Sequence, residues 1–262
     1  MPFTTVSEAH RDQIVVAEAA GRILKDGAPV SATAISNALG ATVTKGSELV
    51  ALQAELSGAL HGFLKSHQKR EGRYLLADIG GLTIDTVFFR YHERANPPIT
   101  VYAKSVECFG AEVISKWCEQ IGTTERAIKV LGNHLAEVAK KAIREKIYIS
   151  ADASCRPLEL ETILIGGGRH SLPHRDAVKW CEKSMSNHAP PLDLRVRDLQ
   201  PDLDDLDMRL GTGQGVGRLL VAMGLSYSRY DAPDIRPPSE VESINAPRVI
   251  DVTKNYIGPE QT

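Results

Sequence analysis

Three patterns that would settle the class of this protein at once are missing from its sequence. Its four cysteines form no C-x-x-C pair, which argues against structural zinc and against a disulfide framework; they are Cys108, Cys118, Cys155 and Cys181. No apolar run reaches the ~18 residues of a membrane-spanning helix. Residues 1–13 lack the basic-then-apolar order of a signal peptide. We therefore expect a cytoplasmic protein with reduced thiols and no membrane partner.

A strong charge of either sign is also missing. The net charge is −2 over 262 residues, so the total charge favours neither nucleic acid nor an acidic membrane surface as a partner. With 42% apolar and 24% charged residues, the composition is that of an ordinary globular protein. The length fits one large domain or two small ones.

The segment YLLADIGGLTIDTVFFRY, residues 74–91, has the pattern of a β-hairpin. A short apolar run is followed by a turn with two glycines, which can adopt positive φ angles, and then by a β-rich run. Two carboxylates, backbone N–H groups and a hydroxyl at such a turn suit a phosphate with its Mg²⁺. The residues that supply these groups are Asp78, Gly80, Gly81, Thr83 and Asp85. The alternative is a plain hairpin with an Asp-Gly-type turn and no ligand.

A second glycine-rich turn ends the segment LETILIGGGR, residues 160–169. Its apolar run predicts a buried strand, and a helix is expected from about Pro173 to Met185, because proline suits a first helical turn. A flat ligand would meet no side chain at the three glycines between them, Gly166, Gly167 and Gly168. A glycine triplet alone is a common turn. It indicates a ligand site here only because the hairpin with its two carboxylates lies upstream.

These segments resemble motifs of the actin, sugar-kinase and seventy-kilodalton heat-shock ATPase superfamily. DIGGLTID is similar to its second phosphate motif, and IGGGR to its adenosine motif. LQAELSGALHG resembles the first connecting helix of actin, FGAE resembles a Gly-Gly-Glu turn of chaperone relatives, and RLLVAMGLS resembles the closing helix. The resemblance covers about residues 47–226, and its layout is closest to that of the plasmid-partition actin-like proteins.

The resemblance implies an α/β fold, namely a ribonuclease-H-like actin/chaperone ATPase half-fold with a mixed sheet and flanking helices. It also implies ATP or ADP with Mg²⁺ as cofactors. Asp78 and Asp85 would position the metal and water, and Gln53 would orient the attacking water. The implied phosphate contacts are Gly80, Gly81 and Thr83. The implied nucleoside contacts are Gly110, Gly166, Gly167, Gly168 and Arg169.

The superfamily fold has two similar halves, and the first half opens with an Asp-x-Gly hairpin of its own. Residues 1–46 contain no D-x-G, so the chain resembles the second, adenosine-binding half alone. We expect a nucleotide-dependent switch with little ATP hydrolysis by this chain alone, because in-line transfer needs charges from both sides. The alternative is a non-catalytic interaction or assembly module that keeps the fold. A protein partner or self-association is compatible with both.

The N-terminal segment, residues 1–46, is expected to be helical, with helices at 7–25 and 32–39 and the second ended by Gly40. This pair also fits a helix-turn-helix, but no Arg/Lys cluster marks a recognition helix, so DNA is not expected as a partner. The glycines at 211–217 lack the strand context of a dinucleotide-binding fingerprint and are expected to let the helix from Val216 to Leu225 pack closely.

Residues 227–262 are expected to form an extended or disordered tail, because five prolines interrupt a stretch with little apolar periodicity. Within it, VIDVTKNYI at residues 249–257 is a short apolar island. We expect this island to dock on a partner or to fold back onto the domain as an added strand. A plain flexible tail is the alternative.

Overall fold

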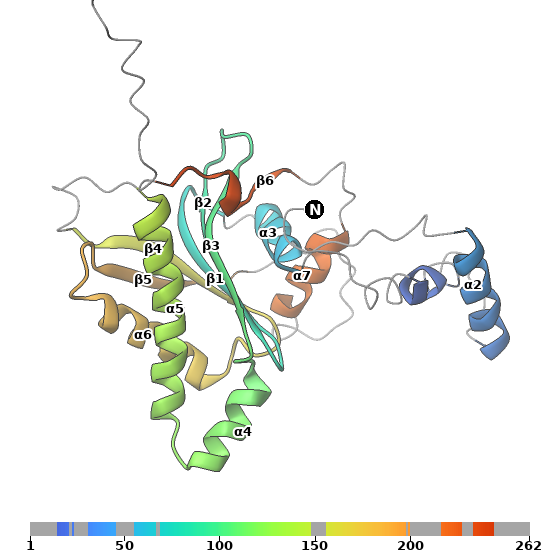
Figure 1. Ribbon diagram of the computed structural model, residues 1–262, viewed down its shortest axis with the longest axis horizontal. Coiled ribbons are helices and arrows are strands. Elements are labelled where there is room, and N and C mark those ends of the chain that lie inside the picture. Colours follow the sequence, from blue (N-terminus) through green and yellow to red (C-terminus); the bar gives the residue numbers. More distant parts are fainter. Residues whose placement is uncertain are drawn as a thin grey trace, which may run out of the picture. The chain divides into compact units, whose positions relative to one another are not determined.

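The structure is a computed structural model, and it describes residues 15–20, 23, 31–45, 55–66, 69–147, 156–197, 199, 216–226 and 233–243. The chain divides into two compact units, and Figure 1 labels their helices and strands. The first unit comprises Met1–His67 and Pro201–Ala232, and the second comprises Gln68–Gln200 and Pro233–Thr262. The domain boundaries expected after residues 46 and 226 remain predictions.

The described part of the first unit is helical. Residues 15–20 are helical, and the bounded helices are α2 (Ala32–Lys45), α3 (Glu55–Lys65) and α7 (Val216–Ser226). The backbones of α3 and α7 approach closely, because a Cβ at Gly58 would lie 2.9 Å from the carbonyl oxygen of Val221. A Cβ at Gly224 would in turn overlap with the carbonyl group of Gly58. Glycines at these positions therefore fix how near the two helices lie.

The expectation that Gly40 ends the second helix is wrong, because α2 continues through Gly40 to Lys45. A glycine inside a helix costs about 1 kcal/mol relative to alanine, which is too little to stop a helix on its own. The segment LQAELSGALHG, residues 52–62, which resembles a connecting helix, corresponds to α3, which begins at Glu55 in the described chain. Residues 46–54, with Gln53 among them, lie outside the described residues.

The second unit is built on a six-stranded mixed sheet with the order β5-β4-β1-β2-β3-β6. Its strands are β1 (Gly72–Ile79), β2 (Ile84–Tyr91), β3 (Ile99–Glu107), β4 (Leu158–Ile165), β5 (Leu192–Arg197) and β6 (Ile235–Arg236). Strands β1, β2 and β3 form an antiparallel meander, which confirms the predicted hairpin. Strand β4 then pairs in parallel with β1, and β5 in parallel with β4.

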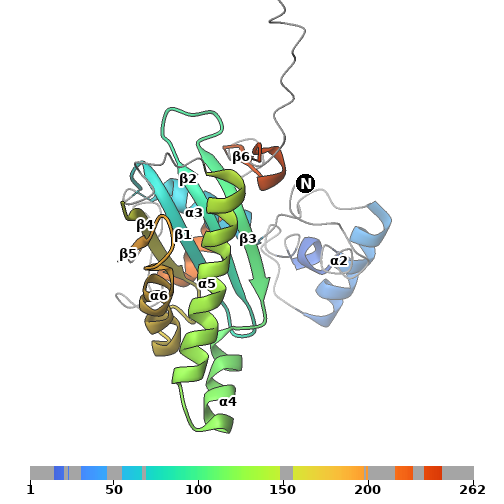
Figure 2. The same ribbon diagram turned by 60° about the vertical axis from the view of Figure 1, so that its left-hand side comes forward.

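Helices cover one face of this sheet. They are α5 (Glu125–Lys146) and α6 (Leu172–Met185), which lie side by side along the strands, whereas α4 (Ala111–Ile121) lies beyond the strand ends (Figure 2). The core beneath them is apolar, with Leu75, Phe88 and Leu164 from the strands and Leu131, Leu135, Ala139 and Val178 from the helices. The helical spacing of α5 and the period of two in the strands produce this face, so the expected mixed sheet with flanking helices is confirmed.

The second face of the sheet is apolar as well. Leu76, Val87, Phe89, Val101 and Ile163 alternate with the core residues along their strands, and each is fully buried. Strands that are buried on both faces read as nearly continuous apolar runs, which is the pattern of residues 74–77 and 162–165.

Part of the expected C-terminal tail has a defined place, which corrects the expectation of disorder from residue 227 onward. Ile235 and Arg236 form β6, which pairs in parallel with Ile99 and Thr100 of β3. A 3₁₀ turn (Pro238–Glu240) follows, and the Lys146 ammonium donates a hydrogen bond to the Val241 carbonyl at 2.6 Å. These backbone pairings order the segment, although its composition is polar. The apolar island at residues 249–257 lies outside the described residues.

Of the helices that the structure describes, none has both the length and the hydropathy that crossing a membrane requires.

The contact between α5 and α6 yields a stability prediction. A Cβ at Gly132 of α5 would lie 2.8 Å from the Ala177 carbonyl oxygen and would overlap with the Trp180 indole. Gly132→Val is expected to lower the free energy of unfolding by ~1–3 kcal/mol, because overpacking forces side chains and backbone to shift. Urea denaturation measures the loss. Lys141→Val, at an exposed position of the same helix, is the control. Equal losses in the two variants would show that Gly132 is not a packing constraint.

Candidate functional site

Three turns meet at the end of the sheet where β1 and β4 have their carboxyl ends. They are the hairpin turn (residues 80–83), the turn before α4 (residues 109–112) and the glycine loop before α6 (residues 166–171). We call this end of the second unit the hairpin edge. In open α/β sheets, ligands bind outside the carboxyl ends of parallel strands.

Backbone hydrogen bonds join the hairpin turn to the turn before α4. Gly110 N–H donates to the Leu82 carbonyl at 3.0 Å. The N–H groups of Ala111 and Glu112 donate to the carbonyls of Gly80 and Gly81, both at 2.9 Å. The first N–H groups of a helix commonly bind an anion, but here hairpin carbonyls accept these bonds. The start of α4 is therefore a structural junction.

The glycine loop is joined to the hairpin in the same way. Gly168 N–H donates to the Ile79 carbonyl at 2.8 Å. Gly166 has a φ of 82°, where residues with a side chain are strained, and a Cβ there would overlap with the Asp78 carboxylate. A Cβ at Gly110 would overlap with the Gly81 backbone. Gly110, Gly166 and Gly168 are thus required by the packing of the turns, whether or not a ligand binds.

Positive φ angles do not occur at the hairpin glycines. Among the described residues, only Gly122 and Gly166 have φ above zero, so Gly80 and Gly81 do not use the left-handed conformation that is open to glycine. The Gly80 N–H donates to the Thr83 carbonyl at 2.9 Å and closes the hairpin. A Cβ at Gly81 would lie 2.9 Å from a carboxylate oxygen of Glu112, which is the flexible end of a side chain.

A buried histidine connects the glycine loop to the turn before α4. His174 of α6 is 2% exposed, and its Nε2 lies 2.8 Å from the Phe109 carbonyl oxygen. Its Nδ1 lies 2.8 Å from the Ser171 hydroxyl. Because a carbonyl only accepts, Nε2 carries the proton and Nδ1 accepts from Ser171. Burial lowers the pKa of His174, which favours this neutral form.

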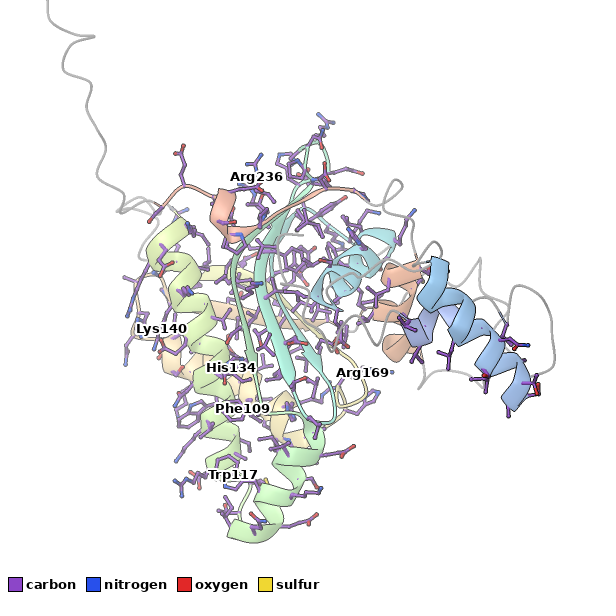
Figure 3. All side chains as sticks on the ribbon, turned by 45° about the vertical axis from the view of Figure 1, so that its right-hand side comes forward. Phe109, Trp117, His134, Lys140, Arg169 and Arg236 are labelled. Atoms are coloured by element: carbon purple, nitrogen blue, oxygen red, sulfur yellow. The ribbon has the colours of Figure 1, made fainter. Side chains whose placement is uncertain are left out.

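A second histidine packs against the same turn from α5. The His134 ring meets the Phe109 ring edge-on, with 6.0 Å between the centroids, and Figure 3 shows the two side by side. His134 Nε2 lies 3.0 Å from the Thr86 hydroxyl of β2. Burial lowers the pKa of His134, and the nearby Glu107 carboxylate raises it by a smaller amount. Phe109 is therefore held through its carbonyl by His174 and through its ring by His134.

Sequence reasoning missed both histidines, although a signal was available. His174 lies in register with Ala177, Val178 and Cys181 on the buried face of α6. A polar residue at an apolar-face position is informative because buried polar groups need hydrogen-bond partners. The partner 65 positions away, however, cannot be identified without the fold.

The two carboxylates of the hairpin lie directly opposite each other. Asp78 of β1 pairs with Asp85 of β2, so both side chains project from the sheet face that is not covered by α5 and α6. Asp78 is 7% exposed, and Asp85 is half-buried. In the described chain, no group of three or more His, Cys, Asp or Glu side chains has a metal-binding arrangement. Two carboxylates fit Mg²⁺ when water and phosphate complete the coordination.

The predicted site residues are otherwise found at the hairpin edge, with one exception. Asp78, Gly80, Gly81, Thr83, Asp85, Gly110, Gly166, Gly167, Gly168 and Arg169 belong to its three turns and to the strand ends beside them. Gly167 is exposed and Arg169 is half-buried. In the view of Figure 3, Arg169 and His134 lie on opposite sides of the β1–β2 hairpin. Gln53 lies outside the described residues. The ligand contacts of all these residues stay predictions.

Comparison with known proteins gives no family. No family model matches the sequence, and no curated protein matches it. Among solved structures, two of the PPX-GPPA enzyme of Aquifex aeolicus are similar to parts of this chain. The first has a TM-score of 0.26 at 8% identity, and the second has a TM-score of 0.25 at 10% identity. Each match covers 49% of this chain and 36% of the other. Likeness at this level supports no conclusion about activity.

The buried histidine predicts a pH dependence of stability. Burial lowers the folded-state pKa of His174 below its ordinary value of 6.5. The unfolded chain therefore takes up this proton at a higher pH than the folded chain does, and stability falls as the pH decreases from about 6.5 toward the folded-state pKa. His174→Gln cannot titrate, and chemical denaturation at about pH 7.5 and about pH 5 should show a smaller loss than in the parent chain. The exposed His170→Gln is the control. A parent-like loss in His174→Gln would contradict this assignment.

Proposed function

We propose that the second unit is an adenine-nucleotide-binding domain of the actin-like ATPase type, with ATP or ADP and Mg²⁺ bound at the hairpin edge. One observation carries the proposal: the two motifs that resemble the phosphate and adenosine motifs lie next to each other. The Gly168 N–H of IGGGR donates to the Ile79 carbonyl of DIGGLTID at 2.8 Å. A single nucleotide could therefore reach both turns.

The topology is compatible with the proposed ribonuclease-H-like half-fold. An antiparallel meander is followed by two parallel strands, and the connecting helices lie on one face. This arrangement places the carboxyl ends of β1 and β4 beside each other, with the two motifs at these ends. The motifs therefore occupy the position where such sheets bind ligands.

The hairpin tip retains groups that suit a phosphate. The N–H groups of Gly81 and Leu82 and the Thr83 hydroxyl have no hydrogen-bond partner among the described residues. Successive backbone N–H groups in a turn form an anion-binding nest. In this proposal Gly80, Gly81 and Thr83 surround the phosphates, and Asp78 and Asp85 position Mg²⁺ through water.

The glycine loop suits the nucleoside. Gly167 is the exposed member of its triplet, so a flat base or ribose could approach the backbone there. Arg169 would lie against the nucleoside, with Gly166, Gly168 and Gly110 shaping the surrounding turns. Gln53 would orient the attacking water if hydrolysis occurs. Magnesium would supply charge neutralisation of the phosphates when it is bound.

We infer a switch with little turnover, working in the cytoplasm with a protein partner or a second copy. The groups at the hairpin edge contact the nucleotide from one side, and in-line phosphoryl transfer needs stabilising charges around the whole transferred group. The second candidate is an assembly module that has lost turnover, and it is favoured by the packing of the turns, which accounts for Gly110, Gly166 and Gly168 without a ligand. Calorimetric titration with ATP·Mg²⁺, run alongside phosphate release, separates the two candidates.

The nucleoside contact is tested by adding a side chain at Gly167. Gly167→Val is expected to abolish adenine-nucleotide binding, because the isopropyl group would occupy the path of the nucleoside. This position is exposed, so the substitution spares the junctions that Gly166 and Gly168 make with β1. His170→Val, at an exposed position of the same loop, is the matched control. Calorimetric titration measures both, and parent-like affinity in Gly167→Val would overturn the assignment.

The catalytic contact is tested at Asp78. Asp78→Asn keeps the shape of the side chain and removes its charge, so any ATP turnover should fall by roughly tenfold or more if the carboxylate positions Mg²⁺ or water. Gln53→Ala should lower kcat as well. Steady-state phosphate release measures turnover, and adenosine affinity serves as the folding control. Robust hydrolysis that persists in both variants would contradict the catalytic assignment.

A further inference from the structure

The register of the sheet places one lysine next to the paired carboxylates. Asp85 of β2 lies opposite Val106 of β3, and Val87 lies opposite Lys104. Residues two apart on a strand project to the same face, so Lys104 shares a face with Asp78 and Asp85. Lys104 is the diagonal neighbour of Asp85, at a typical Cα separation of ~7–8 Å. A lysine side chain spans such a distance.

Lys104 ends a row of buried apolar residues. Its row across the sheet runs through Ile163, Leu76 and Val87, and each of these is fully buried. The carboxylate pair occupies the next row toward the hairpin edge. Lys104 itself is half-buried, and burial lowers its pKa. Long cationic side chains lay their methylenes on such apolar surface and extend the ammonium toward polar surroundings. The polar groups nearest in register are the carboxylates.

We propose that Lys104 supplies the positive charge that binds the phosphate groups of the nucleotide at the hairpin edge. This inference rests on the proposed nucleotide function and names a further residue of the same site. Asp78 and Asp85 bring two negative charges to a place that is proposed to hold an anion. Mg²⁺ and an ammonium beside them would offset that charge. A flexible ammonium is a common point contact for phosphate.

The other cation in the same row, Arg197, is held in an ion pair within the sheet. Arg197 of β5 pairs in register with Ile163, at the opposite end of the row from Lys104. Its guanidinium forms an ion pair with Glu161, with 3.0 Å between Nε and Oε2 and 3.3 Å between Nη2 and Oε1. This two-pronged pairing fixes Arg197 to the strand pair β4–β5. Lys104, on the β3 side, is the cation next to Asp85.

The rival role for Lys104 is a structural counter-charge that only stabilises Asp85 in the fold. The two roles predict different effects of Lys104 on the affinities for ATP and for adenosine. A phosphate-binding cation affects ATP and leaves adenosine unaffected. A structural counter-charge affects the fold, and with it both ligands to the same degree.

The experiment titrates the full chain with ATP·Mg²⁺ and with adenosine by calorimetry. Lys104→Met keeps the length of the apolar stem and removes the charge. ATP affinity should fall by about tenfold or more, since hydrogen bonds to charged groups contribute about 1.5–3 kcal/mol and each ~1.4 kcal/mol is a factor of ten. Adenosine affinity should change by less than about twofold. Lys104→Arg should restore most of the ATP affinity. Arg90→Met, at an exposed position at the far end of β2, is the matched control for losing one cation.

The outcomes separate the inference from the function on which it rests. If the parent chain binds neither ATP nor adenosine, the proposed function fails and the inference fails with it. If the parent binds both, unchanged ATP affinity in Lys104→Met overturns the inference alone. Equal losses of ATP and adenosine affinity in Lys104→Met, with a lower midpoint of thermal unfolding, assign the structural role and also overturn it.

Discussion

Buried backbone groups at the end of the sheet must find partners, and this requirement organises the hairpin edge. The carbonyls of the hairpin turn accept from the first N–H groups of α4, and the Ile79 carbonyl accepts from Gly168. His174 completes the connection by bonding the Phe109 carbonyl and Ser171. The three turns are thus joined in a closed circuit of hydrogen bonds. A ligand that displaced one of these turns would therefore act on hydrogen bonds that also hold the other two.

The circuit divides the glycines of the two motifs into those that the fold requires and those that a ligand could use. Gly110, Gly166 and Gly168 sit where a Cβ would overlap with neighbouring atoms, so the packing of the turns accounts for them. Gly81 and Gly167 are exposed, and at Gly81 only the end of the Glu112 side chain is near. A motif can therefore resemble a nucleotide motif partly because it builds the same junction of turns. The groups available to a phosphate are at the hairpin tip.

Local patterns in the sequence predicted the elements well and the contacts between them poorly. Apolar and β-rich runs together with glycine placement predicted β1, β2 and β4, and a proline suited to a first helical turn predicted α6. The pairing of Ile235 with Ile99 was missed, because a polar, proline-rich segment gives no local sign of the strand it will join. The position of His174 and the role proposed for Lys104 were missed for a related reason. Their importance depends on register and on partners distant in the chain, and one sequence without the fold does not contain that information.

The central claim is that an adenine nucleotide binds across the hairpin turn and the glycine loop. Amide hydrogen exchange of the full chain, with and without saturating ATP·Mg²⁺, tests it residue by residue. The account predicts slower exchange at Gly81, Leu82 and Thr83 and at Gly167 and Arg169, because these are the positions that it assigns to the ligand. The N–H groups of Gly110, Ala111 and Gly168, which are already bonded within the protein, should change less. Unchanged exchange at both turns under saturating nucleotide would contradict the account.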